Sequence, residues 1–99
     1  MIEFKVVEKE EFTFVHFELK ENLTPDILQK FKPPEVNSMK GIILSGRGPI
    51  WLYCYLVHHY HPTKFIATFD PRVGGAIVVE SHNQIYRPGD VIDVDVSYK

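Results

Sequence analysis

GIILSGRGP, residues 41–49, sets the architecture of this 99-residue chain. The apolar run 42–44 is expected of a central strand that is covered on both faces. Pro49 then begins a helix that we expect to reach about Tyr60, and a second apolar strand follows at 65–69. Residues 41–69 therefore predict a β–α–β crossover, a unit that is almost always parallel and right-handed.

Two strands are predicted before this crossover. Apolar and charged residues alternate over residues 2–6, which is typical of a strand with one buried face, and residues 12–19 are strongly β-prone. The polar segment between them is short enough to close a hairpin. Thr24-Pro25 has the form of an N-cap and a first helical residue, and predicts a short helix that ends before Pro33-Pro34.

Two more strands are predicted after the crossover. Residues 70–75 are rich in turn-forming types, so the apolar run 76–79 is expected to return antiparallel to strand 65–69. Residues 91–96 alternate apolar and acidic side chains, which is typical of a half-exposed strand near a sheet edge. The expected fold is α/β: a small mixed β-sheet with a parallel β–α–β core and two helices, in a single domain over residues 1–99.

Composition limits the classes of function. The chain is 44% hydrophobic and 24% charged, as in an ordinary globular domain. Its net charge of −2 gives no global basic field for duplex DNA, so any nucleic-acid ligand should be small and bound at a local site. No apolar run approaches the ~20 residues of a membrane span, and no signal peptide is expected. The lone Cys54 has apolar neighbours, which favours a buried thiol in a reducing compartment and a cytoplasmic location.

The loop after the central strand is a candidate anion site. It leaves a strand and enters a helix N-terminus, where free N–H groups and the helix dipole favour a phosphate. Its glycines let the backbone approach a ligand, and its arginine can bind phosphate with two N–H groups. The motif is neither a Walker loop nor a complete dinucleotide fingerprint, and by itself it is better explained as a tight turn with a solvated arginine. The candidate ligand-binding residues are Ser45, Gly46, Arg47, Gly48 and Pro49.

Histidines gather after the expected helix. His58 and His59 are best explained as surface residues at the helix end, and His16 as a residue on a strand face. His61, which directly precedes a proline, and His82, which follows strand 76–80, are better candidates for proton transfer or for binding manganese, zinc or nickel. The chain has no HExxH or Cys/His zinc pattern, so a closed structural zinc site is not expected.

Asp70-Pro71-Arg72 is the third candidate feature. An acid and an arginine on either side of a proline are usually explained as a turn that neutralises itself. In the functional alternative, Asp70 binds a metal ion or a 2′-hydroxyl group and Arg72 binds a phosphate.

The predicted topology separates these candidates. Arg47 and Asp70 follow parallel strands, so both belong at the carboxyl edge of the sheet, where open α/β sheets bind ligands. His61 precedes its strand and His82 follows the returning strand, so both belong at the opposite edge. Five or six extended residues separate the edges by roughly 17–20 Å. One phosphodiester cannot contact His61 and Asp70 of the same molecule, so chemistry that needs both predicts a site shared between stacked molecules.

In combination, residues 41–52, His61, the segment 70–72 and Ser81-His82 resemble the Csx-three family of CRISPR-associated type III proteins, ring nucleases of the CARF superfamily. The resemblance spans nearly the whole chain and implies a CARF-like (Rossmann-like) domain. It also implies manganese-dependent (Mn2+) cleavage of cyclic tetra-adenylate, the messenger that activates type III effector nucleases. The implied assembly is a homodimer whose ligand is sandwiched against a second dimer, giving a tetramer or a filament.

The resemblance also implies roles for particular residues. His61, Asp70 and Arg72 match the family's catalytic positions, and His82 matches a further histidine of its site. The expected manganese ligands are His61, Asp70 and His82. As hypotheses, His61 acts as general base or metal ligand, Asp70 binds the metal or orients the nucleophile, and Arg72 neutralises developing charge.

Three functions stay open at this point. The first is the ring nuclease. The second is a manganese-dependent 3′ exonuclease (a deadenylase) that removes adenylates from linear RNA. The third is a module that binds the cyclic messenger without cleaving it.

Overall fold

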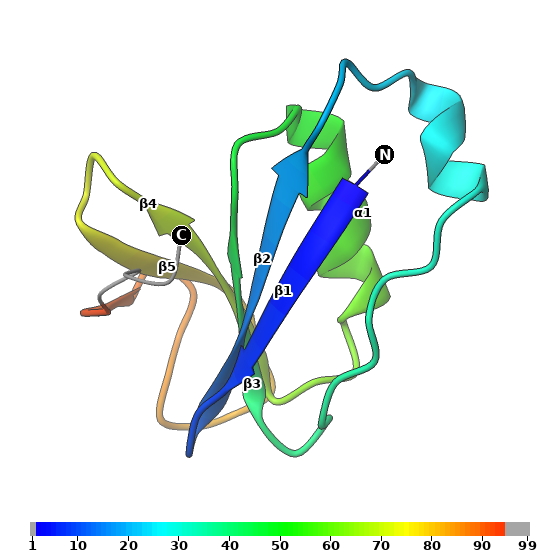
Figure 1. Ribbon diagram of the computed structural model, residues 1–99. Coiled ribbons are helices and arrows are strands. Elements are labelled where there is room, and N and C mark those ends of the chain that lie inside the picture. The colour runs from blue at the N-terminus through cyan, green and yellow to red at the C-terminus, as the bar shows by residue number, and fades with distance from the viewer. Residues whose placement is uncertain (1, 95–99) are drawn as a thin grey trace.

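A computed structural model describes residues 2–94, which fold into one β-sheet with an α-helix against one of its faces (Figure 1). The strands are β1 (Ile2–Glu8), β2 (Phe12–Leu19), β3 (Gly41–Ser45), β4 (Phe65–Asp70), β5 (Gly75–Ser81) and β6 (Val91–Ile92). The helices are η1 (Pro25–Gln29), a 3-10 helix, and α1 (Ile50–His59). The predicted crossover is confirmed as β3, α1 and β4.

The strands lie in the order β1-β2-β3-β4-β5-β6. β2, β3 and β4 run parallel, whereas β1, β5 and β6 are antiparallel to their neighbours. The hairpins β1–β2 and β4–β5 were predicted, but the parallel pairing of β2 with β3 was not. Because parallel strands end at the same side of a sheet, Leu19, Ser45 and Asp70 share one edge, which we call the carboxyl edge.

Apolar side chains cover both faces of the sheet. On one face, Leu52 and Leu56 of α1 pack against a cluster that includes Phe17, Leu44 and Ile66. The other face carries a smaller cluster, comprising Phe14, Ile43, Ala67, Ala76 and Val78. All five residues of β3 are buried, so the prediction of a central strand covered on both faces is confirmed.

The prediction of two helices is wrong in part, because within residues 2–94 only α1 is an α-helix. η1 has five residues and is held by the bonds from Ile27 N–H to the Thr24 carbonyl and from Lys30 N–H to the Ile27 carbonyl. The Thr24 hydroxyl donates to the Asp26 carboxylate instead of capping a backbone N–H group. None of the η1 side chains is fully buried, so packing gives this segment little reason to lengthen into an α-helix.

Three smaller predictions concern Cys54, the strand 91–96 and membrane-spanning segments. Cys54 is exposed rather than buried, because α1 buries Leu52 and Leu56 and the residue midway between them turns away from the sheet. The predicted strand 91–96 is described only at Val91–Ile92, and residues 95 and 96 lie outside the described residues. Neither helix within residues 2–94 has the length and apolar character needed to cross a lipid bilayer.

Candidate functional site

The candidate residues form two groups at opposite ends of β4. His61 precedes β4 and lies beside Glu80 and His82; we call these three residues the His–Glu cluster. Asp70 ends β4, on the same edge as the loop that carries Arg47. The strand has six residues, so its ends are roughly 17 Å apart at about 3.3 Å per residue. The structure therefore brings His61 and His82 together and places Asp70 and Arg72 away from them.

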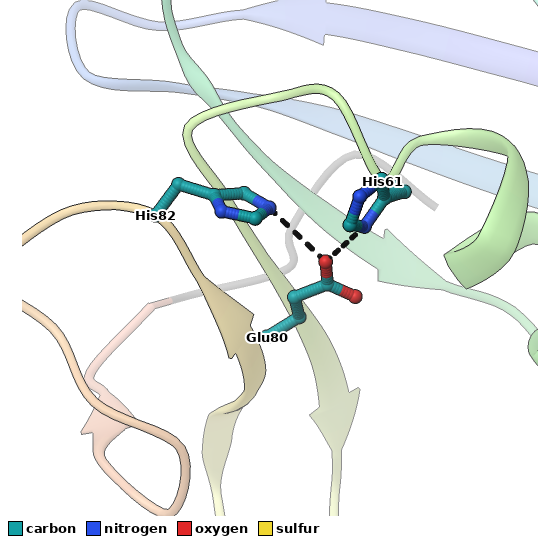
Figure 2. Close-up of side chains that lie close together, drawn as sticks. All are labelled: His61, Glu80 and His82. Atoms are coloured by element: carbon teal, nitrogen blue, oxygen red, sulfur yellow. Dashed lines mark hydrogen bonds and ion pairs between the residues drawn. The ribbon is translucent and has the colours of Figure 1, made fainter.

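Glu80 joins the two imidazoles of the His–Glu cluster (Figure 2). Its Oε2 atom accepts a hydrogen bond from His82 Nε2 at 3.1 Å and another from His61 Nδ1. The ring centroids of His61 and His82 are 5.0 Å apart, and the rings are nearly perpendicular. The His61 and His82 side chains are 58% and 50% exposed, against 28% for Glu80. The cluster is thus open to solvent, with the carboxylate its most buried member.

A β-bulge in β5 puts Glu80 on the correct face for this cluster. Ala67 pairs with Val78 and the preceding Ile66 pairs with Glu80, so Val79 has no partner of its own on β4. In a regular strand, Val78 and Glu80 would point to the same face. The extra residue turns Glu80 to the face that carries Ile66 and α1, and His61 follows directly after that helix.

The His–Glu cluster fits a divalent transition-metal ion. One ligand atom from each residue lies within 4.8 Å of the others. Two imidazole nitrogens and one carboxylate oxygen form a donor set that suits manganese, iron or zinc. Figure 2 shows both rings directed at the same carboxylate oxygen, as ligands of one ion would be. Asp70, which was predicted to belong to the same metal site, lies at the other end of β4 within the protomer.

A groove of about 540 Å³ opens at the carboxyl edge, and we call it the carboxyl-edge groove. Its walls are the end of β2, the loop after β3 and the turn after β4. The residues that line it are His16, Phe17, Glu18, Leu19, Ser45, Gly46, Arg47, Phe69 and Pro71. Three of the predicted ligand-binding residues, Ser45, Gly46 and Arg47, therefore face one concavity.

The glycines of this loop have a packing role that the sequence did not reveal. Gly46 has a φ of +136°, and a Cβ atom there would lie 2.4 Å from the Phe17 carbonyl oxygen. A Cβ atom on Gly48 would lie 2.7 Å from the Phe17 ring. Tyr53 Oη also donates a hydrogen bond of 2.6 Å to the Gly46 carbonyl. The loop is thus held tightly against β2 and α1, which fixes the backbone where the groove begins.

A buried histidine that we assigned only to a strand face lies inside this groove. His16 is 8% exposed, and its Nδ1 atom is 2.9 Å from the Oγ atom of Ser45, its direct neighbour on β3. Its Nε2 atom is 3.5 Å from the Glu18 carboxylate. The serine, the imidazole and the carboxylate form a connected row of polar groups along one wall of the groove.

Positive charge borders the carboxyl edge. Arg47 is exposed in the groove wall, and the structure gives its guanidinium no ion-pair partner among residues 2–94. α1 begins beside it with Pro49 as the cap residue, no side-chain cap bond and no acidic residue in the first turn. The Leu52 N–H donates to the Pro49 carbonyl at 3.1 Å, so the first-turn N–H groups that remain for an anion are those of Ile50 and Trp51.

Asp70 and Arg72 lie in an adjoining concavity of about 630 Å³, which shares Phe69 and Pro71 with the carboxyl-edge groove. Asp70 Oδ1 accepts a hydrogen bond of 2.9 Å from the Arg72 backbone N–H and lies 3.6 Å from Arg72 Nε. The Arg72 side chain is 92% exposed. Within one protomer this is the self-neutralising turn of the simpler explanation, with a guanidinium that still extends into solvent.

Sequence reasoning missed two residues of these sites, Glu80 and His16. Glu80 stands two residues before His82, a spacing that could have suggested a common ligand set. The spacing could not show that the Glu80 carboxylate also reaches His61, because the face of the sheet on which Glu80 lies depends on the bulge at Val79. His16 could not be placed, because its contact with Ser45 depends on the unpredicted pairing of β2 with β3.

Two comparisons with known proteins bear on this chain. A family model described as CRISPR-associated protein (Cas_csx3) matches residues 16–93, a span that contains both the His–Glu cluster and the carboxyl-edge groove. An uncharacterized protein of Aquifex aeolicus (strain VF5) is 55% identical over 84 residues, which cover 81% of this chain and 76% of that relative.

Proposed function

Because this chain belongs to the CRISPR-associated Csx-three family, we propose that it is a manganese-dependent ring nuclease that binds and cleaves cyclic tetra-adenylate. The observation that carries the proposal is the His–Glu cluster, which gathers two imidazoles and a carboxylate within 4.8 Å at a solvent-exposed sheet edge. CARF-superfamily membership, a cytoplasmic location and a homodimer that stacks on its ligand belong to the same proposal.

The carboxyl edge supplies the groups that would bind the ligand. Arg47 and the uncapped N-terminus of α1 offer N–H donors to phosphate oxygens. The exposed Arg72 guanidinium can extend beyond its own protomer to neutralise charge that develops on a phosphate. A compact cyclic anion suits these local positive groups better than long duplex DNA, since the whole chain has a net charge of −2.

The His–Glu cluster supplies the groups that would act on the scissile bond. Manganese bound there would provide a Lewis acid for a phosphate oxygen. Glu80 holds His61 Nδ1 and His82 Nε2 toward one point, so the cluster is organised before any ligand arrives. In this proposal His61 serves as ligand or general base, and Asp70 orients the attacking group.

The two sets of groups must come from different molecules in this scheme. His61 and Asp70 are separated by the length of β4, which exceeds the span of one phosphodiester. Stacking one copy's carboxyl edge on the opposite edge of another copy would bring an Asp70–Arg72 turn to a His–Glu cluster. Turnover should then rise more steeply than in proportion to protein concentration below the assembly threshold.

The test incubates purified protein with cyclic and with linear tetra-adenylate, in manganese or in chelator, and identifies products by mass spectrometry. We expect linear products from the cyclic substrate only with manganese. His61→Ala and Glu80→Gln should abolish this turnover, whereas His58→Ala, an exposed histidine near the end of α1, should retain it.

The other outcomes assign the alternative functions. Shortening of linear tetra-adenylate from its 3′ end, with the cyclic compound untouched, would identify an exonuclease instead. Binding of the cyclic compound without product at high protein concentration would identify a non-catalytic binding module.

A further inference from the structure

A third concavity lies beside the carboxyl-edge groove, and the proposed function gives it no role. It has a volume of about 490 Å³ and lies between residues 20–23, which follow β2, and the start of α1. Pro49 and Trp51 form the helix side of this concavity. Leu19 lines both it and the carboxyl-edge groove, so the two hollows are neighbours along the edge.

We propose that this concavity is a base-binding subsite, in which one adenine of an oligoadenylate ligand stacks on Trp51. The proposal rests on the proposed function for the identity of the ligand, and adds to it the residue that receives a base. Trp51 is half-buried: it packs partly against the apolar cluster beneath α1, which includes Leu52 and Leu56, and also lines the concavity. An indole held in this way loses little freedom when a base stacks on it.

Charge distinguishes this hollow from the neighbouring groove. Its one cationic side chain, Lys20, has an ammonium group 3.5 Å from a Glu3 oxygen and 3.9 Å from a Glu18 oxygen. Glu21 adds a further carboxylate to the lining. A phosphate gains little from such a surface, whereas a neutral base can bind there while its phosphates lie along Arg47 and the N-terminus of α1.

Asn22 gives the subsite a means of selecting adenine. It is exposed and lines the same concavity as Trp51, and its side-chain amide offers a donor and an acceptor together. Adenine presents a matching N6 donor and N7 acceptor, the pair that asparagine reads in nucleic acids. Stacking alone would accept any base, so selectivity for adenine is assigned to Asn22.

Trp51 is the single tryptophan of the chain, so its emission reports on the subsite directly. The experiment uses the His61→Ala protein to prevent turnover and titrates it with linear tetra-adenylate or with an abasic ribose-phosphate tetramer of equal charge. Calorimetry measures binding of both probes independently of fluorescence. We expect saturable quenching by the adenylate and none by the abasic probe.

Variants separate stacking from packing. Trp51→Leu should weaken tetra-adenylate binding by about 5- to 100-fold and leave abasic binding unchanged. Trp51→Phe keeps an aromatic face and should lose much less, with folding of both variants checked by circular dichroism. Asn22→Ala should reduce the preference for tetra-adenylate over tetra-uridylate.

Failure of the subsite differs from failure of the proposed function. Tetra-adenylate that binds without changing Trp51 emission, or equally well in Trp51→Leu, would overturn the subsite alone. If the Trp51→Leu protein does not fold, the titration of the Trp51-containing protein decides the question by itself. Absence of binding by both probes would overturn the proposed ligand, and the subsite with it.

Discussion

The Nδ1 atom of His16 lies 2.9 Å from the Oγ atom of Ser45, so a side-chain hydrogen bond joins two neighbouring parallel strands at the rim of the carboxyl-edge groove. Both residues are almost fully buried. A polar contact in such a place keeps the loop after β3 in register with the end of β2. It therefore links the stability of the sheet to the shape of the groove.

This contact predicts a measurable coupling between the two residues. His16→Leu and Ser45→Ala should each lower the free energy of unfolding by about 1–3 kcal/mol, because each removes a buried hydrogen-bond partner. A double-mutant cycle from urea denaturation should give a coupling of about 0.5–1.5 kcal/mol. Ser38→Ala, at an exposed serine, is the control and should change little. A coupling of zero would show that the contact does not stabilise the fold.

A shared site predicts recovery of activity in mixtures of inactive proteins. His61→Ala removes a member of the His–Glu cluster, and Arg72→Ala removes the exposed guanidinium at the opposite edge. Each variant alone should be inactive on cyclic tetra-adenylate. An equimolar mixture should regain part of the wild-type rate, because some interfaces then combine one intact group from each copy. A mixture as inactive as its components would contradict sharing between molecules.

Replacing the carboxylate of the His–Glu cluster should weaken metal binding. Glu80→Gln preserves size but removes the anionic ligand, so we expect manganese affinity to fall by at least about tenfold. Calorimetric titration of manganese into the purified variants measures this directly. Glu35→Gln, in the exposed linker before β3, should bind the ion as the wild type does. Equal affinities in both variants would remove Glu80 from the ligand set.

Gly46 should tolerate a side chain less well than other glycines with positive φ. Gly46→Ala combines an unfavourable backbone conformation with a Cβ atom 2.4 Å from the Phe17 carbonyl, so it should cost more than about 1–3 kcal/mol of unfolding free energy. Gly89→Ala is the matched control, since its φ is +98° but no atom lies within 4 Å of the added Cβ. Urea denaturation of the two variants should rank them in this order. The opposite order would contradict the close approach to Phe17.

The burial of Tyr60 leads us to expect that the protein loses stability at alkaline pH. Burial raises the pKa of Tyr60 above its ordinary value of 10.0, and its hydroxyl donates a hydrogen bond of 2.6 Å to the Pro34 carbonyl. The unfolded chain then releases this proton at a lower pH than the folded chain does. The stability that Tyr60 contributes is therefore complete below pH 10 and declines as the pH rises above it.

Tyr60→Phe tests this directly. It should lower stability at neutral pH by about 0.5–1.5 kcal/mol, because the Pro34 carbonyl loses its donor. It should also make the decline in stability above pH 10 less steep, as measured by denaturation at several pH values. An unchanged pH dependence would mean that another group controls alkaline unfolding.

The sequence was sufficient for the elements that depend on local patterns. Residues 42–44 and 65–69 are continuous apolar runs, so the crossover around α1 and the placement of His61 and Asp70 at opposite ends of β4 could be predicted. The candidate sites were harder to predict where they depend on contacts between residues far apart in the sequence. His16 meets Ser45 only through the pairing of β2 with β3, which no local pattern indicates. The helix predicted after Thr24 is only the 3-10 helix η1. Thr24 has the correct residue type for an N-cap, but its hydroxyl donates to the Asp26 carboxylate instead.

The unpaired Val79 makes the register of β5 as important as its composition. If Val79 paired with Ile66, Glu80 would move to a position opposite Phe65, and its carboxylate would turn through the plane of the sheet, away from at least one ring of the cluster. A homologue can thus retain every donor atom in its alignment and still be unable to assemble them. Among relatives of this protein, the pairing of β5 with β4 should therefore be established before matching donor residues are read as evidence of cation binding.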